Sequence, residues 1–419
     1  MKLSVITSAL LAACVAARPE PVLQIRQSQV DFNFAGNKVR GVNIGGWLVL
    51  EPWITPSLWN RWKNNPAAGP VDEYNLCRVL GKSVCQAELK KHWDTWITQN
   101  DFNTIKSYGL NTVRIPIGYW AFTLNSGDPY VQGQVAYLDR AIGWARAAGL
   151  KVWIDLHGAP GGQNGFDNSG LRDRIGFLQG NTATQMLAVI KKVAEKYCQP
   201  AYRDTVVLIE VLNEPMGPKL DWKKLSQFTY DGWGIIRREG PTWVGYSDAF
   251  LPLPKWNNRL GPQNKVLVDK HRYQVFSEGE VSRSYWQHFD AACSARWDFT
   301  GSNKYVVVGE WSAAMTDCAR WLNGWNRGAR YDGTFQSSRS YGTCNDKGNV
   351  DTMTQTQKDD LRRFVEAQLD SYEKTHGWIF WTYKTELGNR SDDWSYSRLV
   401  NRGIMPKPPG SRRFPKPCG

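Results

Sequence analysis

Eight short apolar segments, most of them separated by longer stretches with helical periodicity, constrain the fold of this chain more than any other feature. They are rich in Val, Ile and Trp, and many end on a polar or charged residue: GVNIGGW (41–47), NTVRIPIG (111–118), KVWIDLHG (151–158), VVLIEVLNE (206–214), TWVGYSD (242–248), KVLVDKHRY (265–273), KYVVVGEW (304–311) and GWIFWTYK (377–384). Helical spacing of apolar residues occurs between them, for example at 138–149, 183–197, 222–239 and 357–374.

Strands that alternate with helices pair in parallel through right-handed crossovers. We therefore predict an α/β fold, a closed (β/α)8 TIM barrel formed by a single domain with long strand-to-helix insertions. A doubly wound open sheet is the alternative, although no GxGxxG follows the first strand to support its dinucleotide-binding version.

Three parts of the chain depart from the regular alternation. The link between the fifth and sixth strands is short and rich in Pro and Asn, so we expect its helix to be degraded. Long insertions follow the first strand (48–100) and the seventh (312–356), and the Pro-rich tail PKPPGSRRFPKPCG is expected to be non-helical.

The N-terminus has the features of a signal peptide. Lys2 precedes the apolar run LSVITSALLAACVAA, and small residues from Val15 to Ala17 offer a cleavage site. We predict a signal peptide at 1–17, a short propeptide at 18–26 and a catalytic domain at 27–419. Since no later segment reaches about 18 apolar residues, we expect a protein that is secreted, extracellular or associated with the cell wall.

The charge and the tryptophan content narrow the choice of partner. The net charge is +13, but no five consecutive Lys or Arg residues occur, which argues against a nucleic-acid arm and for a generally basic surface. The 21 tryptophans suit sugar binding, because their flat rings stack on sugar faces; filling a large core explains any one of them equally well.

The cysteines and histidines indicate which disulfides and metal sites the chain can form. Seven cysteines remain after signal cleavage, an odd number that leaves at least one unpaired. There is no CxxC and no HExxH, and the five histidines are scattered, so we predict no metal and no cofactor. Asn389 lies in the sequon Asn-Arg-Ser and is a glycosylation candidate.

Two carboxylates follow apolar strands directly: Glu214 after the fourth strand and Glu310 at the end of the seventh. Because ligands bind at the C-terminal ends of barrel strands, both acids are expected in one site. Other strand ends supply Arg114, His157, His271, Tyr273 and Trp381. Two facing carboxylates define glycoside hydrolysis, in which a separation of roughly 5–5.5 Å gives retention and about 6.5–9.5 Å gives inversion.

A structural interpretation exists for each of these residues. An acid at a strand end is usually a solvated rim residue, Arg114 fits an ion pair, and His157 fits a satisfied buried histidine. Glu210 shares a face with Glu214 by the period of two, and we interpret it as a deeper member of an ion-pair network. The coincidence of such residues at successive strand ends favours function over these single explanations.

Long motifs then link the chain to a known family. They run in order from about Val39 to the C-terminus: GVNIGGWLVLEPWITPSLW, NTVRIPIGYWAF, DLHGAPGGQNGFDNSG, EVLNEP, HRYQVFS, VVGEWS and FWTYKTE. The chain resembles the secreted fungal exo-β-1,3-glucanases of glycoside hydrolase family 5. The resemblance implies a retaining enzyme that releases glucose from the non-reducing ends of β-1,3-glucans, with transglycosylation at high sugar concentration.

The resemblance also implies roles for individual residues. Glu214 resembles the general acid/base and Glu310 the nucleophile, with Asn213 on the sugar 2-hydroxyl and Arg114 keeping Glu310 ionised. The remaining shell and substrate residues implied in the same way are His157, His271, Tyr273, Glu51, Trp381, Phe166, Phe276, Asp167 and Asn168. Glu51 and Trp381 would hold the terminal glucose, and the two phenylalanines would clamp the next one. We expect Glu214 to be protonated because the neighbouring carboxylate raises its pKa.

The disulfides that the resemblance implies are Cys293–Cys418 and Cys318–Cys344. Among the other cysteines, a local Cys77–Cys85 bridge with Cys198 free is one arrangement. We expect a monomer that takes a β-glucan polysaccharide or oligosaccharide, with no nucleic-acid or membrane partner. The alternatives are a β-1,6-glucanase, an endo-β-1,4-glucanase or a glycoside-specific glucosidase, a glucan-binding wall protein without activity, and a basic scaffold or nucleic-acid protein, for which no motif is present.

Overall fold

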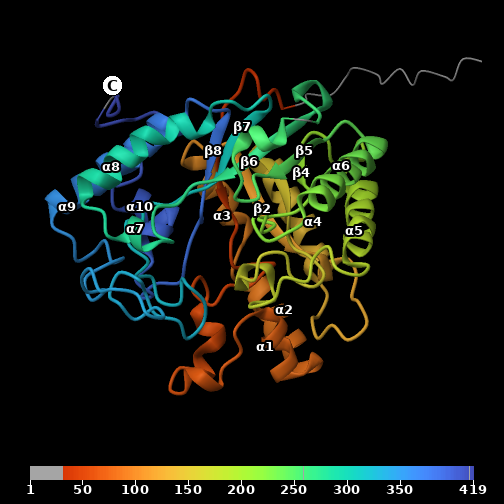
Figure 1. Cartoon of the computed structure of the whole chain (residues 1–419), viewed down its shortest axis with the longest axis horizontal. Coiled ribbons are helices and arrows are strands. Elements are labelled where there is room, and N and C mark those ends of the chain that lie inside the picture. Colours follow the sequence, from red (N-terminus) through yellow and green to blue (C-terminus); the bar gives the residue numbers. More distant parts are fainter. Residues whose placement is uncertain (1–31, 258, 415) are drawn as a thin grey trace, which may run out of the picture.

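A computed structural model describes residues 32–257, 259–414 and 416–419, and these form a closed barrel of eight parallel strands in sequence order (Figure 1). The strands are β1 Val39–Asn43, β2 Thr112–Gly118, β3 Lys151–Gly158, β4 Val206–Glu210, β5 Trp243–Ser247, β6 Val266–His271, β7 Tyr305–Glu310 and β8 Gly377–Phe380. The predicted TIM barrel is therefore confirmed. The predicted signal peptide and propeptide lie outside the described residues.

Helices surround this barrel (Figure 1). They are α1 Glu73–Leu80, α2 Lys82–Thr95, α3 Gln99–Ser107, α4 Gln134–Ala148, α5 Thr182–Tyr197, α6 Trp222–Glu239, α7 Glu278–Val281, α8 Tyr285–Ser294, α9 Gln355–Tyr372 and α10 Tyr396–Asn401. Local signals fix some of their ends: Thr354 and Gln357 form a capping box at the start of α9, and Gly149 ends α4 in the left-handed conformation. Every described helix is too short or too polar to cross a bilayer.

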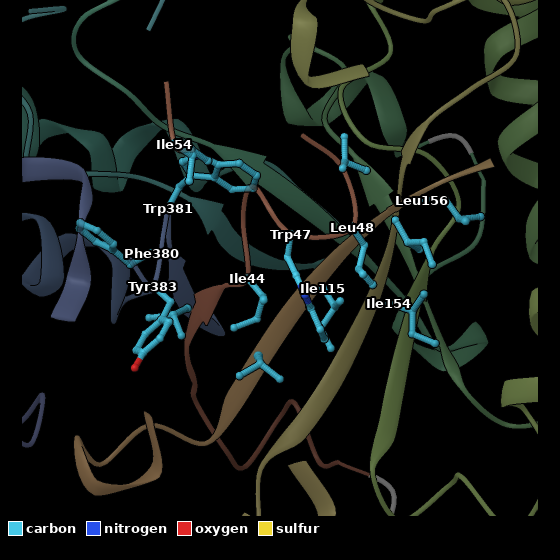
Figure 2. Close-up of a cluster of buried hydrophobic side chains, with 14 of the residues drawn as sticks. Ile44, Trp47, Leu48, Ile54, Ile115, Ile154, Leu156, Phe380, Trp381 and Tyr383 are labelled. Atoms are coloured by element: carbon cyan, nitrogen blue, oxygen red, sulfur yellow. The ribbon is translucent and has the colours of Figure 1, made fainter. Parts of the chain in front are cut away.

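Alternation along the strands directs one set of side chains to an apolar outer layer and the other set into the barrel. Ile115 on β2 and Ile154 and Leu156 on β3 are fully buried within the large core that surrounds the barrel, which also holds residues of the segment after β1, such as Trp47. Figure 2 shows these side chains together with Phe380 at the end of β8. Burial of such aliphatic and aromatic groups supplies most of the stability of a domain of this size.

The barrel interior is apolar at one end and charged above it. Near the N-terminal ends of the strands, a separate buried cluster contains Trp153, Leu208, Leu267, Val307 and Ile379. Two residues further along their strands lie Asp155, Glu210 and Asp269, all fully buried. The carboxylates thus sit on an apolar floor that gives them a rigid base.

The structure describes the three regions that were predicted to depart from the regular alternation of strands and helices. Among the described residues of the β5–β6 link, the helices are short 3-10 turns at Leu253–Trp256 and Pro262–Asn264, as expected of its Pro and Asn content. The insertion after β1 contains α1 and α2, whereas the described chain between β7 and α9 forms turns and loops. Three disulfides tie these regions down, Cys77–Cys85, Cys318–Cys344 and Cys293–Cys418, and Cys198 is free and buried.

Candidate active site

A pocket of about 370 Å³ opens at the C-terminal ends of the strands. Glu214 and Glu310 both line it, as predicted from the strand ends. The other predicted residues in its lining are Glu51, Phe166, Asp167, Asn168, His271, Tyr273, Phe276 and Trp381. The residues predicted from the sequence therefore make up half of the pocket lining.

The two acids reach the pocket by different local structures. Glu310 ends β7, where the register against β6 shifts by one residue and places Glu310 opposite His271. Gly309 fills the shifted position, and a Cβ there would lie 1.9 Å from Asp269 Oδ1, so no larger residue fits. Glu214 lies four residues beyond the end of β4, in a left-handed conformation with φ of 43°. One oxygen of Glu214 and one of Glu310 lie within 4.8 Å of each other.

Arg114 lies in the middle of β2 rather than at its end, which corrects the predicted position. Its fully buried guanidinium donates to Glu310 Oε1 at 3.0 Å and to Asn213 Oδ1 at 2.9 Å. Below these it pairs with Glu210 at 3.0 Å, Asp155 at 3.0 Å and Asp269 at 3.3 Å. The ion-pair role predicted for Glu210 is confirmed, and Arg114 joins this deeper layer to the site above.

His157 connects β3 to the segment after β4. Its Nδ1 lies 2.5 Å from Asp155 Oδ2, and its Nε2 lies 3.3 Å from Asn213 Nδ2. The Asn213 backbone N–H donates to Leu156 O at 2.9 Å, which fixes this segment against β3. The ring also stacks on Trp381, with centroids 5.4 Å apart. Asn213 is therefore held from three sides beside the acids.

His271 lies between three carboxylates. Its Nδ1 is 2.7 Å from Glu214 Oε1 and 3.4 Å from Glu310 Oε2, and its Nε2 is 3.3 Å from Asp269 Oδ2. Burial alone would lower the His271 pKa, but the charges of Glu310 and Asp269 and the hydrogen bonds to Asp269 and Glu214 raise it well above its ordinary value. The carboxylates around the ring therefore favour the protonated imidazole.

The pKa values of the two acids differ from the prediction. Burial would raise the Glu214 pKa, but the hydrogen bond and charge of His271, helped by the hydrogen bond from Asn168, bring it below its ordinary value. Burial and the Glu214 charge raise the Glu310 pKa despite the opposing charges of His271 and Arg114. The prediction that a neighbouring carboxylate raises the Glu214 pKa is wrong, because His271 lies closer to Glu214 than to Glu310.

Tyr273 completes the contacts of Glu310. Its hydroxyl donates to Glu310 Oε2 at 2.8 Å. Burial and the charge of Glu310 raise the Tyr273 pKa well above its ordinary value, so the phenol keeps its proton. Glu310 thus receives one hydrogen bond on each oxygen, from Tyr273 and from Arg114.

Two further buried carboxyl groups, Glu51 and Asp167, line the pocket. Glu51 Oε2 accepts from Trp53 Nε1 at 2.8 Å, and burial together with the Asp167 charge raises its pKa well above the ordinary value. Burial raises the pKa of Asp167 to about 7, and its Oδ2 is buried without a hydrogen-bond partner. Asp167 Oδ2 is therefore a polar atom of the pocket that a ligand could pair with.

Aromatic rings surround the pocket entrance. Phe166 is 43% exposed and Phe276 is 42% exposed, as suits residues that contact a ligand rather than a core. Phe250, which the sequence analysis did not single out, packs edge-to-face on Phe166 at 6.3 Å. Asn168 in the same loop donates to Glu214 Oε2 at 3.1 Å. The entrance loop therefore contacts the acid directly.

The sequence did not single out several residues of the pocket lining and of the charged layer beneath it. Asp155 and Asp269 precede His157 and His271 by two positions, and the period of two could have placed them on the same face. The segment after β7 supplies lining residues for which no sequence signal stood out: Leu322, Asn323, Arg327, Arg330 and Phe335. Trp394 after β8 is a further lining residue of this kind.

Glu214, His271 and Glu310 offer three potential metal-ligand atoms within 4.8 Å. We interpret them as a hydrogen-bonded acid–imidazole cluster, because the closest pair, His271 Nδ1 and Glu214 Oε1, has the spacing of a charge-assisted hydrogen bond.

The glycosylation candidate Asn389 is packed inside the folded chain. Its side chain is 5% exposed and its amide nitrogen donates to the backbone oxygens of Trp53 and Arg320, so the folded chain offers no free amide for a glycan there.

A TIM barrel whose pocket presents two close carboxylates among hydrogen-bond donors and aromatic rings is a glycoside hydrolase. The cellulase profile, glycosyl hydrolase family 5, matches residues 77–336. The chain is 49% identical over 395 residues to a glucan 1,3-beta-glucosidase of Schwanniomyces occidentalis, covering 93% of this chain and 92% of that protein. It is 48% identical over 419 residues to a glucan 1,3-beta-glucosidase of Blumeria graminis, covering 98% and 97%. The chain therefore belongs to glycosyl hydrolase family 5.

A solved structure with the same fold is the rutinosidase from Aspergillus niger. It superposes with a TM-score of 0.72 at 21% identity, over 90% of this chain and 99% of that one. This likeness concerns the barrel architecture.

Proposed function

We propose that this enzyme is a retaining exo-β-1,3-glucosidase that releases glucose from the non-reducing ends of β-1,3-glucans. The observation that carries the proposal is the Glu214–Glu310 pair, whose nearest oxygens lie within 4.8 Å in an enclosed pocket. This spacing fits the carboxylate separation of retaining glycosidases, roughly 5–5.5 Å, better than the separation of about 6.5–9.5 Å in inverting enzymes. The similarity to glucan 1,3-beta-glucosidases supports the linkage.

In this proposal Glu310 attacks the anomeric carbon and Glu214 donates a proton to the leaving oxygen, which gives a covalent glucosyl-enzyme. Arg114 and Tyr273 orient one Glu310 oxygen each, and Asn213 faces the sugar 2-hydroxyl. Glu214 then takes a proton from water, which attacks the intermediate and releases β-glucose. A second glucan in place of water would give transglycosylation.

The exo preference is proposed from the walls of the pocket. Glu51 and Asp167 would hold hydroxyls of the terminal glucose, with Trp381 beneath the ring. The β3 and β7 segments are joined across one side, where Arg172 donates to Trp325 O at 2.9 Å and Arg327 pairs with Asp173 at 2.6 Å. A groove closed in this way admits a chain end rather than the middle of a polymer.

The decisive test is Glu310→Gln, with laminarin as the substrate. The wild-type enzyme should release glucose alone at first, and proton NMR should show the β-anomer as the initial product. The variant should lose turnover by several orders of magnitude while keeping the wild-type melting temperature within a few degrees. Near-normal turnover would refute the assignment of the nucleophile, an initial α-anomer would refute retention, and early oligosaccharides would favour an endo-glucanase.

We also propose that the enzyme is secreted and acts as a monomer. Three disulfides are consistent with an oxidising compartment. The protein recovered from culture medium should lack residues 1–17 by N-terminal sequencing and should elute with the mass of one chain in light-scattering chromatography. Retention in the cell with an intact N-terminus would contradict secretion.

A further inference from the structure

Each histidine of the active site follows an aspartate on its own strand by two positions. Asp155 precedes His157 on β3, and Asp269 precedes His271 on β6. Both aspartates are fully buried, and in each the Oδ2 atom lies between Arg114 and the histidine ring. The two Asp-x-His pairs are thus alike on their inner side, where the aspartate joins the ring to Arg114. The outer nitrogen of each ring is the one that points away from its aspartate.

The outer nitrogen of His157 faces a donor. Arg114 can only donate, so the Asn213 atom that lies 2.9 Å from its Nη2 is the amide oxygen. The other amide atom is then the NH2 group, which lies 3.3 Å from His157 Nε2. A hydrogen bond between them requires Nε2 to accept, and the ring proton therefore lies on Nδ1, which donates to Asp155.

The outer nitrogen of His271 faces acceptors. Its Nδ1 lies near Glu214 and Glu310, and its Nε2 lies near Asp269. Carboxylates on both sides of the ring favour a proton on each nitrogen. The direction of the His271 pKa, well above its ordinary value, agrees with this geometry.

We propose that Asp155 and Asp269 are positioning residues with opposite effects on two like histidines. Asp155 fixes the neutral tautomer of His157 that accepts from Asn213, and so aims the amide at the sugar 2-hydroxyl. Asp269 keeps His271 doubly protonated, and so supplies the proton that Glu214 delivers. The proposal rests on the retaining mechanism proposed above.

The proton balance follows from the hydrogen bond between His271 Nδ1 and Glu214 Oε1. In the free enzyme the proton lies on the imidazolium and Glu214 is a carboxylate. As the glycosidic C–O bond breaks, this proton passes through Glu214 to the leaving oxygen, and His271 becomes neutral. In the second half-reaction the attacking water gives a proton to Glu214, which returns it to His271. No other reactant is needed.

Several charged groups surround His271 and enter its titration. Asp269 lies on the same strand as His271, and Glu214 and Glu310 face the ring from the segments of β4 and β7. Arg114 and Glu210 lie below the ring. The remaining titratable groups that act on His271 or on its carboxylates are Asp248, which is paired with Lys270, and His157. Asp269 is the partner of Nε2, so its removal changes the side of the ring remote from the substrate.

The first test measures kcat/KM against pH on an aryl β-glucoside for wild type, Asp269→Asn and Asp155→Asn. Loss of the Asp269 charge should lower the pKa of His271 and move the alkaline limb about 1 to 3 pH units toward acid. Asp155→Asn removes a carboxylate with the same burial and the same Arg114 contact, and should leave that limb in place. It should instead reduce the rate advantage of a glucoside over its 2-deoxy analogue.

An alkaline limb that Asp269→Asn leaves unmoved, or that both variants move equally, would overturn the inference. A second measurement avoids the variants: 15N NMR of histidine-labelled wild-type enzyme, in which only five histidines need assignment. At neutral pH His271 should give two protonated nitrogens and His157 one protonated Nδ1. A neutral His271 would overturn the inference even if laminarin is cleaved, whereas failure to cleave laminarin would refute the proposed function and leave the NMR result standing.

Discussion

Arg114→Met tests how far the active site depends on one buried cation. Methionine keeps much of the length and the apolar stem of arginine but removes the guanidinium that pairs with Glu210, Asp155, Asp269 and Glu310. Removal of one partner from a buried charge network costs about 3–5 kcal/mol, because the remaining charges stay desolvated without compensation. With an unfolding entropy of about 2.1 cal/mol/K per residue, a domain of roughly 390 residues should lose about 4–6 °C in melting temperature.

The loss should depend on pH with a defined sign. The charge of Arg114 lowers the pKa values of Glu210, Asp269 and Glu310. Without it, the folded-state pKa values of Glu210 and Glu310, which already lie above their ordinary values, rise further, and the depressed pKa of Asp269 also rises. These carboxylates then ionise less readily in the folded chain, so stability falls as pH rises through their pKa values. The difference from wild type should therefore be larger near pH 7 than near pH 4. In the rate profile the acidic limb, which reports ionisation of Glu310, should move up by about 1 to 3 units.

Arg40→Met is the matched control. Arg40 makes a two-pronged pair with Glu373 at 2.8 and 3.2 Å, but its side chain is 39% exposed. Loss of such a pair should cost less than about 1 kcal/mol and leave the rate profile unmoved. Calorimetry at several pH values and initial rates on an aryl glucoside provide both readouts. The reasoning is refuted if Arg114→Met loses no more stability than Arg40→Met, or if its loss is the same at every pH.

Two further predictions concern the pocket walls. Because burial raises the Asp167 pKa to about 7, its ionisation costs the folded state up to about 4 kcal/mol. Asp167→Asn should raise the melting temperature near pH 8 but not near pH 4, and raise KM; equal shifts at both pH values would contradict this. Replacing Cys318 and Cys344 by Ser should raise KM, because the 26-residue loop that this disulfide closes lines the pocket. Replacing Cys293 and Cys418, which are 125 residues apart, should instead lower the free energy of unfolding by up to about 5 kcal/mol without changing KM. Thermal melts and steady-state rates provide the two measurements. A changed KM in the Cys293/Cys418 variant together with an unchanged KM in the Cys318/Cys344 variant would contradict this prediction.

The barrel and the identity of the acids were accessible from sequence for a physical reason. A strand buried on both faces leaves a short apolar run, and eight such runs in alternation with helices have few ways to pack. The period of two then assigns faces, which is how Glu210 was placed beneath Glu214. Long motifs in a fixed order supplied the proposed roles, because each motif combines a strand with the loop that follows it.

Other features depend on distances between segments remote in sequence. The Glu214 pKa is set by His271 on another strand, 2.7 Å away, and no local pattern reports that distance. Asn389 sits in a valid sequon, yet its burial follows from contacts with the segment after β1 and with the segment after β7. The walls from the β7 insertion are loops without periodicity, so their pocket residues gave no signal.

The charged layer inside the barrel is better explained by function than by stability. Well-packed apolar residues in place of a buried ion network are often as stable or more stable, so such a network is weak evidence of stabilisation. Here the layer lies directly on an apolar floor that already closes the barrel, and its members contact both histidines, Asn213 and Glu310. A guanidinium and its carboxylates have fixed geometry and charge, so they hold the residues above them in one orientation and one protonation state. Preorganisation of this kind lowers the reaction barrier only if the layer is rigid, and the strand position of each member provides that rigidity.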